Sequence, residues 1–373
     1  WGWDCHGLPI ENLVEKELGL ATKKDIENYG VEKFNQTARN AVFRYVDEWK
    51  KIIPRTGRFV DMENAYVTMD SSYTESVWWS FKKLYEKGLI YEGFKVMPYC
   101  PRCGTTLSNF EVNQGYKDIT DISVYIKFEL EDIKNTYLLV WTTTPWTLPG
   151  NTALAINDTV IYVKVKINTD NGGKDNVFYI IAKDLAKKVL KENYEITEEF
   201  SGKKLVGKKY KPVFDYYTEE YKNNDKIWKI YAGSFVTTED GTGIVHIAPA
   251  FGSDDYELSQ KENLPVIHHV NLDGAFKNEV VDFAGQLVKP KDNPQKADIE
   301  IIKYLAHKGP LFEKEKIIHS YPHCWRCDTP LLNYATSSWF VTVTAIKDKL
   351  IKENSKVTWK PKNIRDGRFG KWL

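Results

Sequence analysis

The chain has 373 residues, of which 42% are hydrophobic and 28% are charged, and its formal net charge is +1. This composition is typical of a folded protein, and the length predicts two or three domains. The near-zero net charge does not indicate nucleic-acid binding, so any RNA contact would need a local basic patch. No run of 18 or more apolar residues occurs, which predicts a protein without a membrane span or a membrane partner.

The N-terminal part of the chain shows the periodicity of helices. Apolar side chains within Val31–Ile52 recur in steps of three and four, which predicts helix within residues 11–53. A second helix is predicted at Asp70–Lys87, with Asp70 or Ser71 as the N-cap and Gly88 as the C-terminal stop. Its expected apolar face consists of Val77, Phe81, Leu84 and Tyr85.

Short β-rich runs replace the helices between about residue 99 and residue 320. We expect strands at Ser123–Phe128, Tyr137–Trp141, Val160–Val165, Val177–Ala182, Trp228–Tyr231 and Gly243–Ile247. Helices are expected at Ala182–Glu192 and Ala297–Lys308, and an exposed polar loop at Asn168–Asp175. The pattern predicts a β-barrel-like or α+β domain.

Mixed α/β character returns after about residue 318. A β-branched run occupies Leu332–Val343, and a charged, helix-like stretch follows near Ala345–Glu353. We therefore expect a β-rich block to be inserted in an α/β host.

Two CxxC pairs are the strongest chemical signal in the sequence. Cys100, Cys103, Cys324 and Cys327 can together supply four thiolates to one tetrahedral zinc ion. The alternatives are a ligand set that has lost its metal, or two separate redox motifs. In a chain without secretory features the pattern favours zinc over disulfides, and it predicts a cytoplasmic protein. His319 and His323 lie nearby and are interpreted as packing or turn residues, while Cys5 has no assigned role.

The separation of the two pairs predicts a clamp. A metal bound to both pairs brings the ends of the intervening block together, and metal binding can offset the entropy of closing so long a loop. Such a zinc ion is structural, because four thiolates leave no open position for water.

The segment Trp141-Thr-Thr-Thr-Pro-Trp-Thr-Leu-Pro-Gly150, which we call the threonine run, follows a predicted strand. Pro145 and Pro149 prevent regular strand pairing, so we expect a turn that exposes hydroxyls and backbone groups. Such groups suit a ribose, a carbonyl or a positioned water molecule. The alternative is an ordinary strand edge made of β-branched residues.

A second unusual segment runs from Gly241 to Asp255. Its strand carries His246, which as a lone histidine is more often a packing residue than a ligand. Asp254 or Asp255 is expected at the start of a following helix, where a carboxylate binds an amine or caps the helix. A basic run is also present, and it is either an RNA contact or a solvated hairpin face, formed by Lys203, Lys204, Lys208, Lys209 and Lys211.

Several segments of the sequence resemble segments of a known family. The segment Gly2-Trp-Asp-Cys-His-Gly-Leu-Pro-Ile-Glu11 closely resembles one that follows the first ATP signature of isoleucyl-tRNA synthetases. Four further segments resemble that family in the same order: Tyr99-Cys-Pro-Arg-Cys-Gly-Thr-Thr-Leu-Ser108, the threonine run, the Gly-Thr-Gly-Ile-Val-His run and His319-Ser-Tyr-Pro-His-Cys-Trp-Arg-Cys327. The resemblance covers essentially the whole chain.

The resemblance implies a Rossmann-type catalytic domain interrupted by an editing domain. The implied boundaries are residues 1–98 for the first catalytic part, 99–122 for a zinc knuckle and stem, 123–318 for the editing insertion, and 319–373 for the second knuckle and the return to the catalytic domain. It also implies one structural zinc ion bound by the four cysteines.

The resemblance further implies roles for single residues. Asp4 holds the amino group of isoleucine in the synthetic site, and Asp255 binds the amino group of the wrongly attached amino acid. His246 shapes the floor of the editing pocket. The pocket is lined by Thr142, Thr143, Thr144 and Thr147.

The implied enzyme is an isoleucine-tRNA ligase, a cytoplasmic monomer that uses ATP, Mg²⁺, isoleucine and tRNA(Ile), and that hydrolyses valyl-tRNA(Ile). One methylene separates valine from isoleucine, too small a difference for a single binding pocket to discriminate well. The ATP signatures His-x-Gly-His and Lys-Met-Ser-Lys-Ser are absent, so we expect an internal fragment that retains at most editing. The alternatives are a free-standing deacylase that edits in trans and a non-catalytic RNA-binding zinc module.

Overall fold

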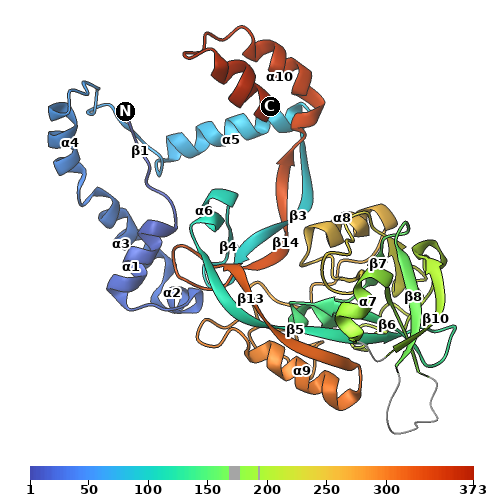
Figure 1. Cartoon of the computed structure of the whole chain (residues 1–373). Coiled ribbons are helices and arrows are strands. Elements are labelled where there is room, and N and C mark those ends of the chain that lie inside the picture. Colours follow the sequence, from blue (N-terminus) through green and yellow to red (C-terminus); the bar gives the residue numbers. More distant parts are fainter. Residues whose placement is uncertain (168–176, 192–193) are drawn as a thin grey trace. The chain divides into compact units, whose positions relative to one another are not determined.

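The structure is a computed structural model that describes residues 1–167, 177–191 and 194–373. It divides into two compact units (Figure 1). Unit 1 consists of Trp1–Phe94 and Ser337–Leu373, and unit 2 is the continuous stretch Lys95–Thr336. A β-rich block therefore interrupts an α/β host, as predicted, while the exact domain boundaries stay a prediction. The loop expected at Asn168–Asp175 lies outside the described residues.

Unit 1 is mainly helical. Its helices are α1 (Leu8–Leu18), α2 (Lys23–Tyr29), α3 (Val31–Phe43), α4 (Val46–Arg55), α5 (Ser71–Glu86), α10 (Lys347–Asn354) and α11 (Gly370–Trp372). The short strands β1 (Gly2–Trp3) and β2 (Tyr66–Val67) pair in parallel. The region expected to be helical at 11–53 is divided among α1 to α4, because Gly19 and Gly30 adopt positive φ angles of 69° and 107° that end α1 and α2.

Helix α5 confirms the helix predicted at Asp70–Lys87, with Asp70 at its N-cap position and Gly88 at a φ of 66° just after its end. Its expected apolar face is largely exposed in the described structure, although Phe81 packs edge-on against Trp339 at a centroid distance of 6.2 Å. The helix buries none of its residues, and Val77, Phe81 and Tyr85 are between 42% and 62% exposed.

Unit 2 is built around a six-stranded mixed sheet with the order β10-β8-β9-β6-β5-β13. These strands are β5 (Tyr116–Glu129), β6 (Thr136–Thr142), β8 (Ile161–Ile167), β9 (Phe178–Ala182), β10 (Tyr194–Ser201) and β13 (Leu311–Pro322). Among the described strand pairs of this sheet, only β6 and β9 are parallel. Strands β10 and β13 are edges, so in the described residues the sheet is open and the α+β alternative, not a closed barrel, is correct.

Two smaller sheets complete the strands. The order β11-β7-β12 joins β7 (Ala153–Ile156), β11 (Lys229–Ala232) and β12 (Ile244–Ile247). The order β14-β3-β4 joins β3 (Ile90–Cys100), β4 (Thr105–Thr106) and β14 (Leu332–Val341). All six predicted strands of the β-rich block and the predicted strand after residue 332 are therefore present.

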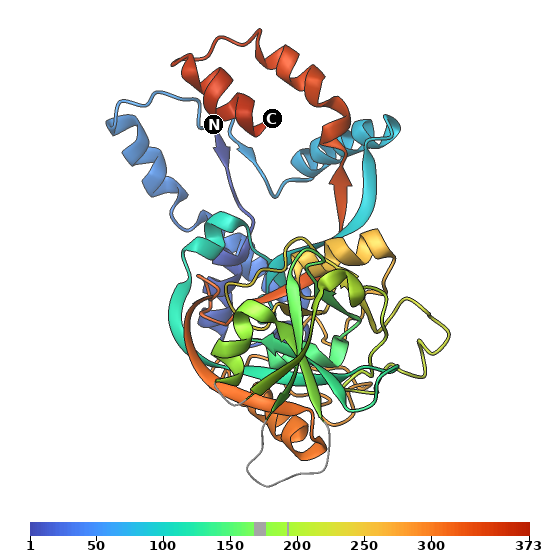
Figure 2. The same cartoon turned by 45° about the vertical axis from the view of Figure 1, so that its right-hand side comes forward.

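Helices pack on these sheets by burying one face. They are α6 (Asn109–Asn113), α7 (Lys183–Leu190), α8 (Ser253–Glu262) and α9 (Lys296–Lys308). Helix α9 buries Ala297, Ile301, Ile302 and Leu305, which follow helical spacing. The helix lies alongside β13, as both cartoon views show (Figures 1 and 2).

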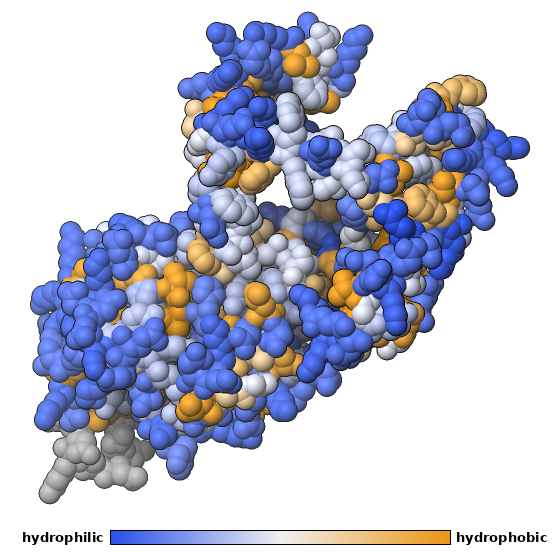
Figure 3. Space-filling view, turned by 180° about the vertical axis from the view of Figure 1, so that it is seen from behind, coloured by the Kyte–Doolittle hydropathy of each residue, from blue (hydrophilic) through white to orange (hydrophobic). Residues whose placement is uncertain are grey.

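The apolar core of unit 2 lies between the six-stranded sheet, α9 and the segments that follow β12. On the face shown in Figure 3 hydrophilic side chains predominate, and hydrophobic ones occur in small separate patches. Among the described residues, no helix combines the length and the apolar character needed to cross a membrane.

Candidate active site and metal centre

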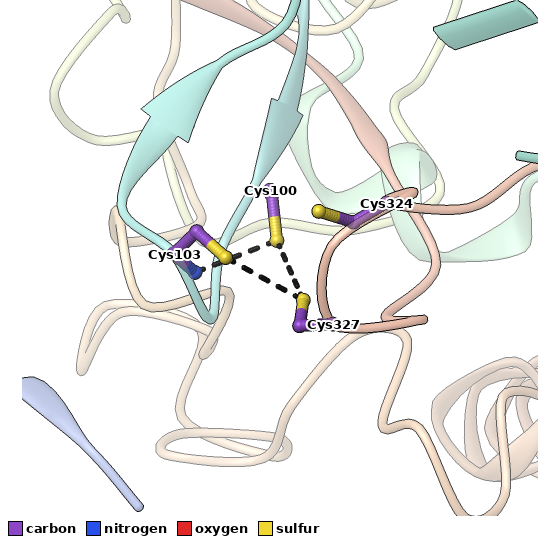
Figure 4. A group of neighbouring side chains, drawn as sticks. All are labelled: Cys100, Cys103, Cys324 and Cys327. Carbon is purple, nitrogen blue, oxygen red and sulfur yellow. Dashed lines mark hydrogen bonds between the residues drawn. The ribbon is translucent and has the colours of Figure 1, made fainter. Parts of the chain in front are cut away.

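The four predicted cysteine ligands lie together in unit 2. Their ligand atoms are all within 4.8 Å of one another, and the Sγ atom of Cys327 is 3.5 Å from those of Cys100 and Cys103. Figure 4 shows the side chains converging from two separate loops, one after β3 and one after β13. The sequence prediction that the two distant CxxC pairs meet is therefore confirmed.

The two cysteine loops have the same local geometry. Gly104 N–H donates to the Cys100 carbonyl, and Asp328 N–H donates to the Cys324 carbonyl, both at 2.8 Å. Gly104 and Asp328 have φ angles of 66° and 65°, so each loop ends on a left-handed residue. This repeated turn presents both thiols of a pair to one point, which suits a metal ion that prefers sulfur ligands.

The neighbouring histidines take no part in the cysteine cluster, as predicted. The Nε2 atom of His319 lies 3.6 Å from the Asp121 carboxylate, and Nδ1 of His323 lies 3.1 Å from the Tyr321 carbonyl.

At the end of β6 the threonine run bends toward the interior of the protein. Residues Pro145–Gly150 form a 3₁₀ helix, η1, and all of them are buried. The Oγ1 atom of Thr144 is 3.3 Å from Oγ1 of both Thr142 and Thr147. The expectation of exposed hydroxyls is wrong for Thr142 and Thr147, because the proline-bounded turn folds inward and leaves them only 9% and 6% exposed.

His246 joins this threonine group from β12. Its Nε2 atom lies 3.1 Å from Thr147 Oγ1, and its Nδ1 atom lies 2.8 Å from Asn151 Nδ2. Burial disfavours the imidazolium form, and with the nearby His269 it lowers the pKa of His246 to about 3. The ring is therefore neutral near pH 7 with both nitrogens engaged, so it can orient hydroxyls, and its low pKa makes it a weak proton acceptor.

Asp255 lies in the first turn of α8 and is partly buried. It is not the helix cap, because Gly252 occupies the N-cap position. Its Oδ2 atom accepts a 2.8 Å hydrogen bond from Ala248 N–H, two residues after His246. Burial raises the pKa of Asp255 to about 6, although the Ala248 N–H opposes this shift.

Gly252 leaves the space that the Asp255 carboxyl occupies. A Cβ atom at position 252 would lie 2.7 Å from the Asp255 Cγ atom, so a larger residue would displace the carboxylate.

The remaining predicted site residues stand apart from the threonine–histidine group. Thr143 is partly exposed and takes no part in its hydrogen bonds. Asp4 belongs to unit 1, where it is exposed and accepts a 3.4 Å hydrogen bond from His6 N–H. Among the described residues, the Asp255 carboxylate is linked to the group through the N–H of Ala248, which lies two residues after His246.

Two polar residues of the site were not predicted. Asn151 follows the Pro149-Gly150 turn, and Tyr210 donates a 2.7 Å hydrogen bond from its hydroxyl to Asn151 Oδ1. In the sequence, Tyr210 could have been recognised because it is an apolar residue between Lys209 and Lys211 within the basic run. Within the basic run, Lys211 pairs with Glu129 at 2.7 Å and Lys208 pairs with Asp132.

The family model for tRNA synthetases class I (I, L, M and V) matches residues 1–373. The chain belongs to this family. The chain is 48% identical to the isoleucine--tRNA ligase of Clostridium novyi and 49% identical to that of Clostridium acetobutylicum, with 100% of this chain and 34% of each relative covered. It is 46% identical to that of Treponema denticola, with 100% of this chain and 36% of the relative covered. The chain therefore spans about a third of the length of these relatives, and the family prediction is confirmed.

Solved structures with some likeness include an editing domain of the cytosolic leucyl-tRNA synthetase from P. knowlesi, with 16% identity and a TM-score of 0.31. That match covers 40% of this chain and 66% of the other. A second is GlLeuRS-CP1, with 20% identity and a TM-score of 0.30. That match covers 37% of this chain and 57% of the other.

Proposed function

We propose that unit 2 edits aminoacyl-tRNA by hydrolysing valine wrongly attached to tRNA(Ile), within a protein that is an isoleucine-tRNA ligase. The observation that carries the proposal is the buried group of threonine hydroxyls held by a neutral His246, next to the loop that binds the Asp255 carboxylate. The isoleucine--tRNA ligase names of the relatives support the choice of amino acid.

The ionised Asp255 carboxylate binds the α-ammonium group of the valyl ester by a charge-assisted hydrogen bond. The hydroxyls of Thr142, Thr144 and Thr147, with neighbouring backbone groups, orient a water molecule against the ester carbonyl carbon. Attack forms a carbon–oxygen bond to water and breaks the bond to the ribose oxygen. Because no side chain of the group is a general base, the proton from water passes to the ribose oxygens, which releases valine and intact tRNA.

The cysteine cluster is proposed to hold one structural zinc ion. Four thiolates bound at about 2.3 Å in a tetrahedron would place their sulfur atoms about 3.8 Å apart. The distances of 3.5 Å between Cys327 and two partners, and the 4.8 Å limit for the whole set, fit this geometry.

For the whole protein we propose the ligase reaction with ATP, Mg²⁺, isoleucine and tRNA(Ile), in a cytoplasmic monomer. In that reaction Asp4 would bind the amino group of isoleucine. A free-standing deacylase is disfavoured, because the family match includes residues 1–98 as well as the β-rich block.

Replacement of the proposed ammonium ligand tests the editing function. Hydrogen bonds to charged groups contribute about 1.5–3 kcal/mol, so Asp255→Asn should lower kcat/KM for valyl-tRNA(Ile) hydrolysis by about 10- to 100-fold. The matched control is Asp254→Asn, which changes the exposed neighbouring carboxylate and should leave hydrolysis within about twofold. Equal hydrolysis by Asp255→Asn and the parent chain would refute the site, and RNA binding without hydrolysis by the parent would favour a non-catalytic module.

A further inference from the structure

The backbone of Trp146, in the 3₁₀ helix η1, is held by buried side chains from two other parts of the chain. The Trp146 N–H donates a 3.0 Å hydrogen bond to Asp298 Oδ1 of α9. The Trp146 carbonyl oxygen lies 2.9 Å from Nε2 of His269, a residue of the segment between α8 and α9. Both side chains are fully buried, so water does not compete for these contacts.

Helix η1 does not supply partners for these two backbone groups by itself. Trp146 is in the first turn, where an N–H group has no acceptor within the helix. The 3₁₀ hydrogen bond to the Trp146 carbonyl would come from the N–H of residue 149, which is a proline and has none. The two buried groups therefore depend on donors and acceptors from elsewhere in the chain.

The imidazole of His269 is oriented to be that donor. Burial lowers its pKa to about 4, so the ring is neutral near pH 7. Because a carbonyl oxygen only accepts, the ring proton in this contact lies on Nε2. The ring packs edge-on against Phe251 and stacks on Phe276, at centroid distances of 4.7 and 6.0 Å. Gly150 makes room for it, since a Cβ atom at position 150 would lie 2.2 Å from Nδ1.

The carbonyl held by His269 belongs to the same planar peptide group as the N–H of Thr147. That N–H donates to the Thr144 carbonyl at 3.0 Å, and the Thr147 hydroxyl donates to the same oxygen at 2.8 Å. A rotation of this peptide group that released the carbonyl from His269 would also turn the N–H away from Thr144. The Thr147 hydroxyl would then lose its fixed position.

We propose that His269 is a positioning residue for the threonine run: its Nε2–H fixes the peptide group between Trp146 and Thr147, while Asp298 fixes the preceding one. The effect on hydrolysis rests on the proposed editing function, whereas the effect on the order of η1 does not.

The first test measures the order of η1 by hydrogen–deuterium exchange in the full 373-residue chain. His269→Leu keeps an apolar side chain at this position but removes the donor. Exchange at residues 146–151 should quicken about tenfold, the scale of one hydrogen bond, while β6 and α9 keep the parent protection.

The second test separates positioning from a merely structural role through the kinetics of valyl-tRNA hydrolysis. In His269→Leu, kcat should fall about tenfold, because the hydroxyl that orients water is displaced, and KM should stay within about twofold, because Asp255 is untouched. His269→Gln should recover kcat to within about threefold of the parent, since its amide nitrogen can donate to the same carbonyl. A merely structural role would lower stability in both variants and leave kcat of the folded protein unchanged.

The matched control is His268→Leu. The Nε2 atom of His268 also lies close to a backbone carbonyl, that of Ala335 at 2.8 Å, but this carbonyl is outside η1. The variant should keep the parent exchange rates at residues 146–151 and kcat within about twofold. Equal effects in the two leucine variants would contradict a specific role of His269.

Parent exchange rates at residues 146–151 in His269→Leu would overturn the proposal. If that variant does not fold, Gly150→Ala decides, because the added methyl group crowds the imidazole while the histidine remains. It should lower kcat, and by less in the His269→Gln background, whose flexible side chain can yield; an unchanged kcat would overturn the proposal. A parent chain that does not hydrolyse valyl-tRNA would defeat the proposed function alone, since exchange would still report the order of η1.

Discussion

At the scale of single residues, His246 and Asp255 illustrate how burial selects a protonation state. Burial disfavours the charged form of each group, so it lowers the pKa of the histidine to about 3 and raises that of the aspartate to about 6. Near pH 7.5 both should therefore be in the forms that the proposed reaction needs, a neutral imidazole and an ionised carboxylate.

These pKa values predict the pH dependence of editing. Asp255 must be ionised to bind the ammonium group, so kcat/KM for valyl-tRNA(Ile) should fall as the pH drops below about 6, by about tenfold per pH unit. His246 should add no inflection above pH 5, because its pKa of about 3 lies well below that range. The measurement is a pH–rate profile from pH 5 to 8, corrected for spontaneous ester hydrolysis.

The control for this profile is Asp255→Asn, which should lack the inflection near pH 6 because amide groups do not titrate. An inflection of the same size in that variant would assign the pH dependence to another group and would remove the role proposed for the carboxylate.

The polar residues of the site differ in how visible they are in the sequence. The threonine run and His246 stand out, because polar residues interrupt stretches that otherwise read as buried strands. Asn151 and Tyr210 were missed, because their role depends on a hydrogen bond between residues 59 positions apart. Spacing along one chain cannot specify such a contact, and neither can it show that the hydroxyls of Thr142 and Thr147 turn inward.

At the scale of elements, a buried ionic cluster ties three segments to the threonine run. Lys289 Nζ lies 2.9 Å from the Asp121 carboxylate of β5 and 2.8 Å from the Asp298 carboxylate of α9, and all three side chains are at most 1% exposed. Asp298 also accepts a 3.0 Å hydrogen bond from Trp146 N–H in η1. Burial alone would lower the pKa of Lys289, but the two carboxylates outweigh it and raise that pKa.

Removal of the cation should therefore be strongly destabilising. Lys289→Met leaves two buried carboxylates unpaired, so we expect the free energy of unfolding to fall by about 3–5 kcal/mol at pH 7.5. Burial already raises the pKa of Asp298 to about 6, above its unfolded value, so in the variant stability is regained as the pH falls toward 5. Urea unfolding at both pH values measures the effect.

The matched control is Lys303→Met on α9. Lys303 forms an exposed pair with Glu300 at 3.1 Å, and such pairs contribute about 0–1 kcal/mol. Similar losses of stability in both variants would show that the charge at position 289 has no special role.

Element identity was more predictable than the connections between elements. The strands of unit 2 were recognisable because alternating or continuous runs of β-branched residues rarely form anything other than strands. The division of 11–53 into separate helices depended on Gly19 and Gly30 taking left-handed backbone angles, which the periodicity of the apolar residues masks. Sheet closure was not predictable, because it depends on whether β10 and β13 find partners, and the order β10-β8-β9-β6-β5-β13 leaves both at edges.

At the scale of the whole molecule, the β-rich block of unit 2 is held together both at the cysteine loops and just beyond them. Past these loops the chain continues through β5 and comes back through β13, and these strands pair from Tyr116 opposite Pro322 to Ile126 opposite Leu311. The cysteine cluster lies at the end of this pair where Pro322 stands. The clamp expected from the cysteines is therefore reinforced by a sheet contact that the sequence did not reveal.

This double closure predicts what zinc removal does. Because β5 and β13 already hold the ends of the insertion together, chelation should loosen the two cysteine loops without unfolding the six-stranded sheet. Hydrogen–deuterium exchange should quicken about tenfold or more at residues 99–107 and 323–331, while β6 and β8 keep their protection.

Metal analysis supplies the controls for this prediction. The parent chain should carry one zinc ion, Cys324→Ser should lose it, and Cys5→Ser should keep it, because Cys5 lies in unit 1 outside the cluster. If chelation instead removed protection throughout β5, β6 and β8, the metal would be the main closure of unit 2 and the strand pair β5–β13 would depend on it. Because strand pairing needs no ion, and because Glu111 also contacts Trp325 and Arg326 of the second cysteine loop, we expect local loosening.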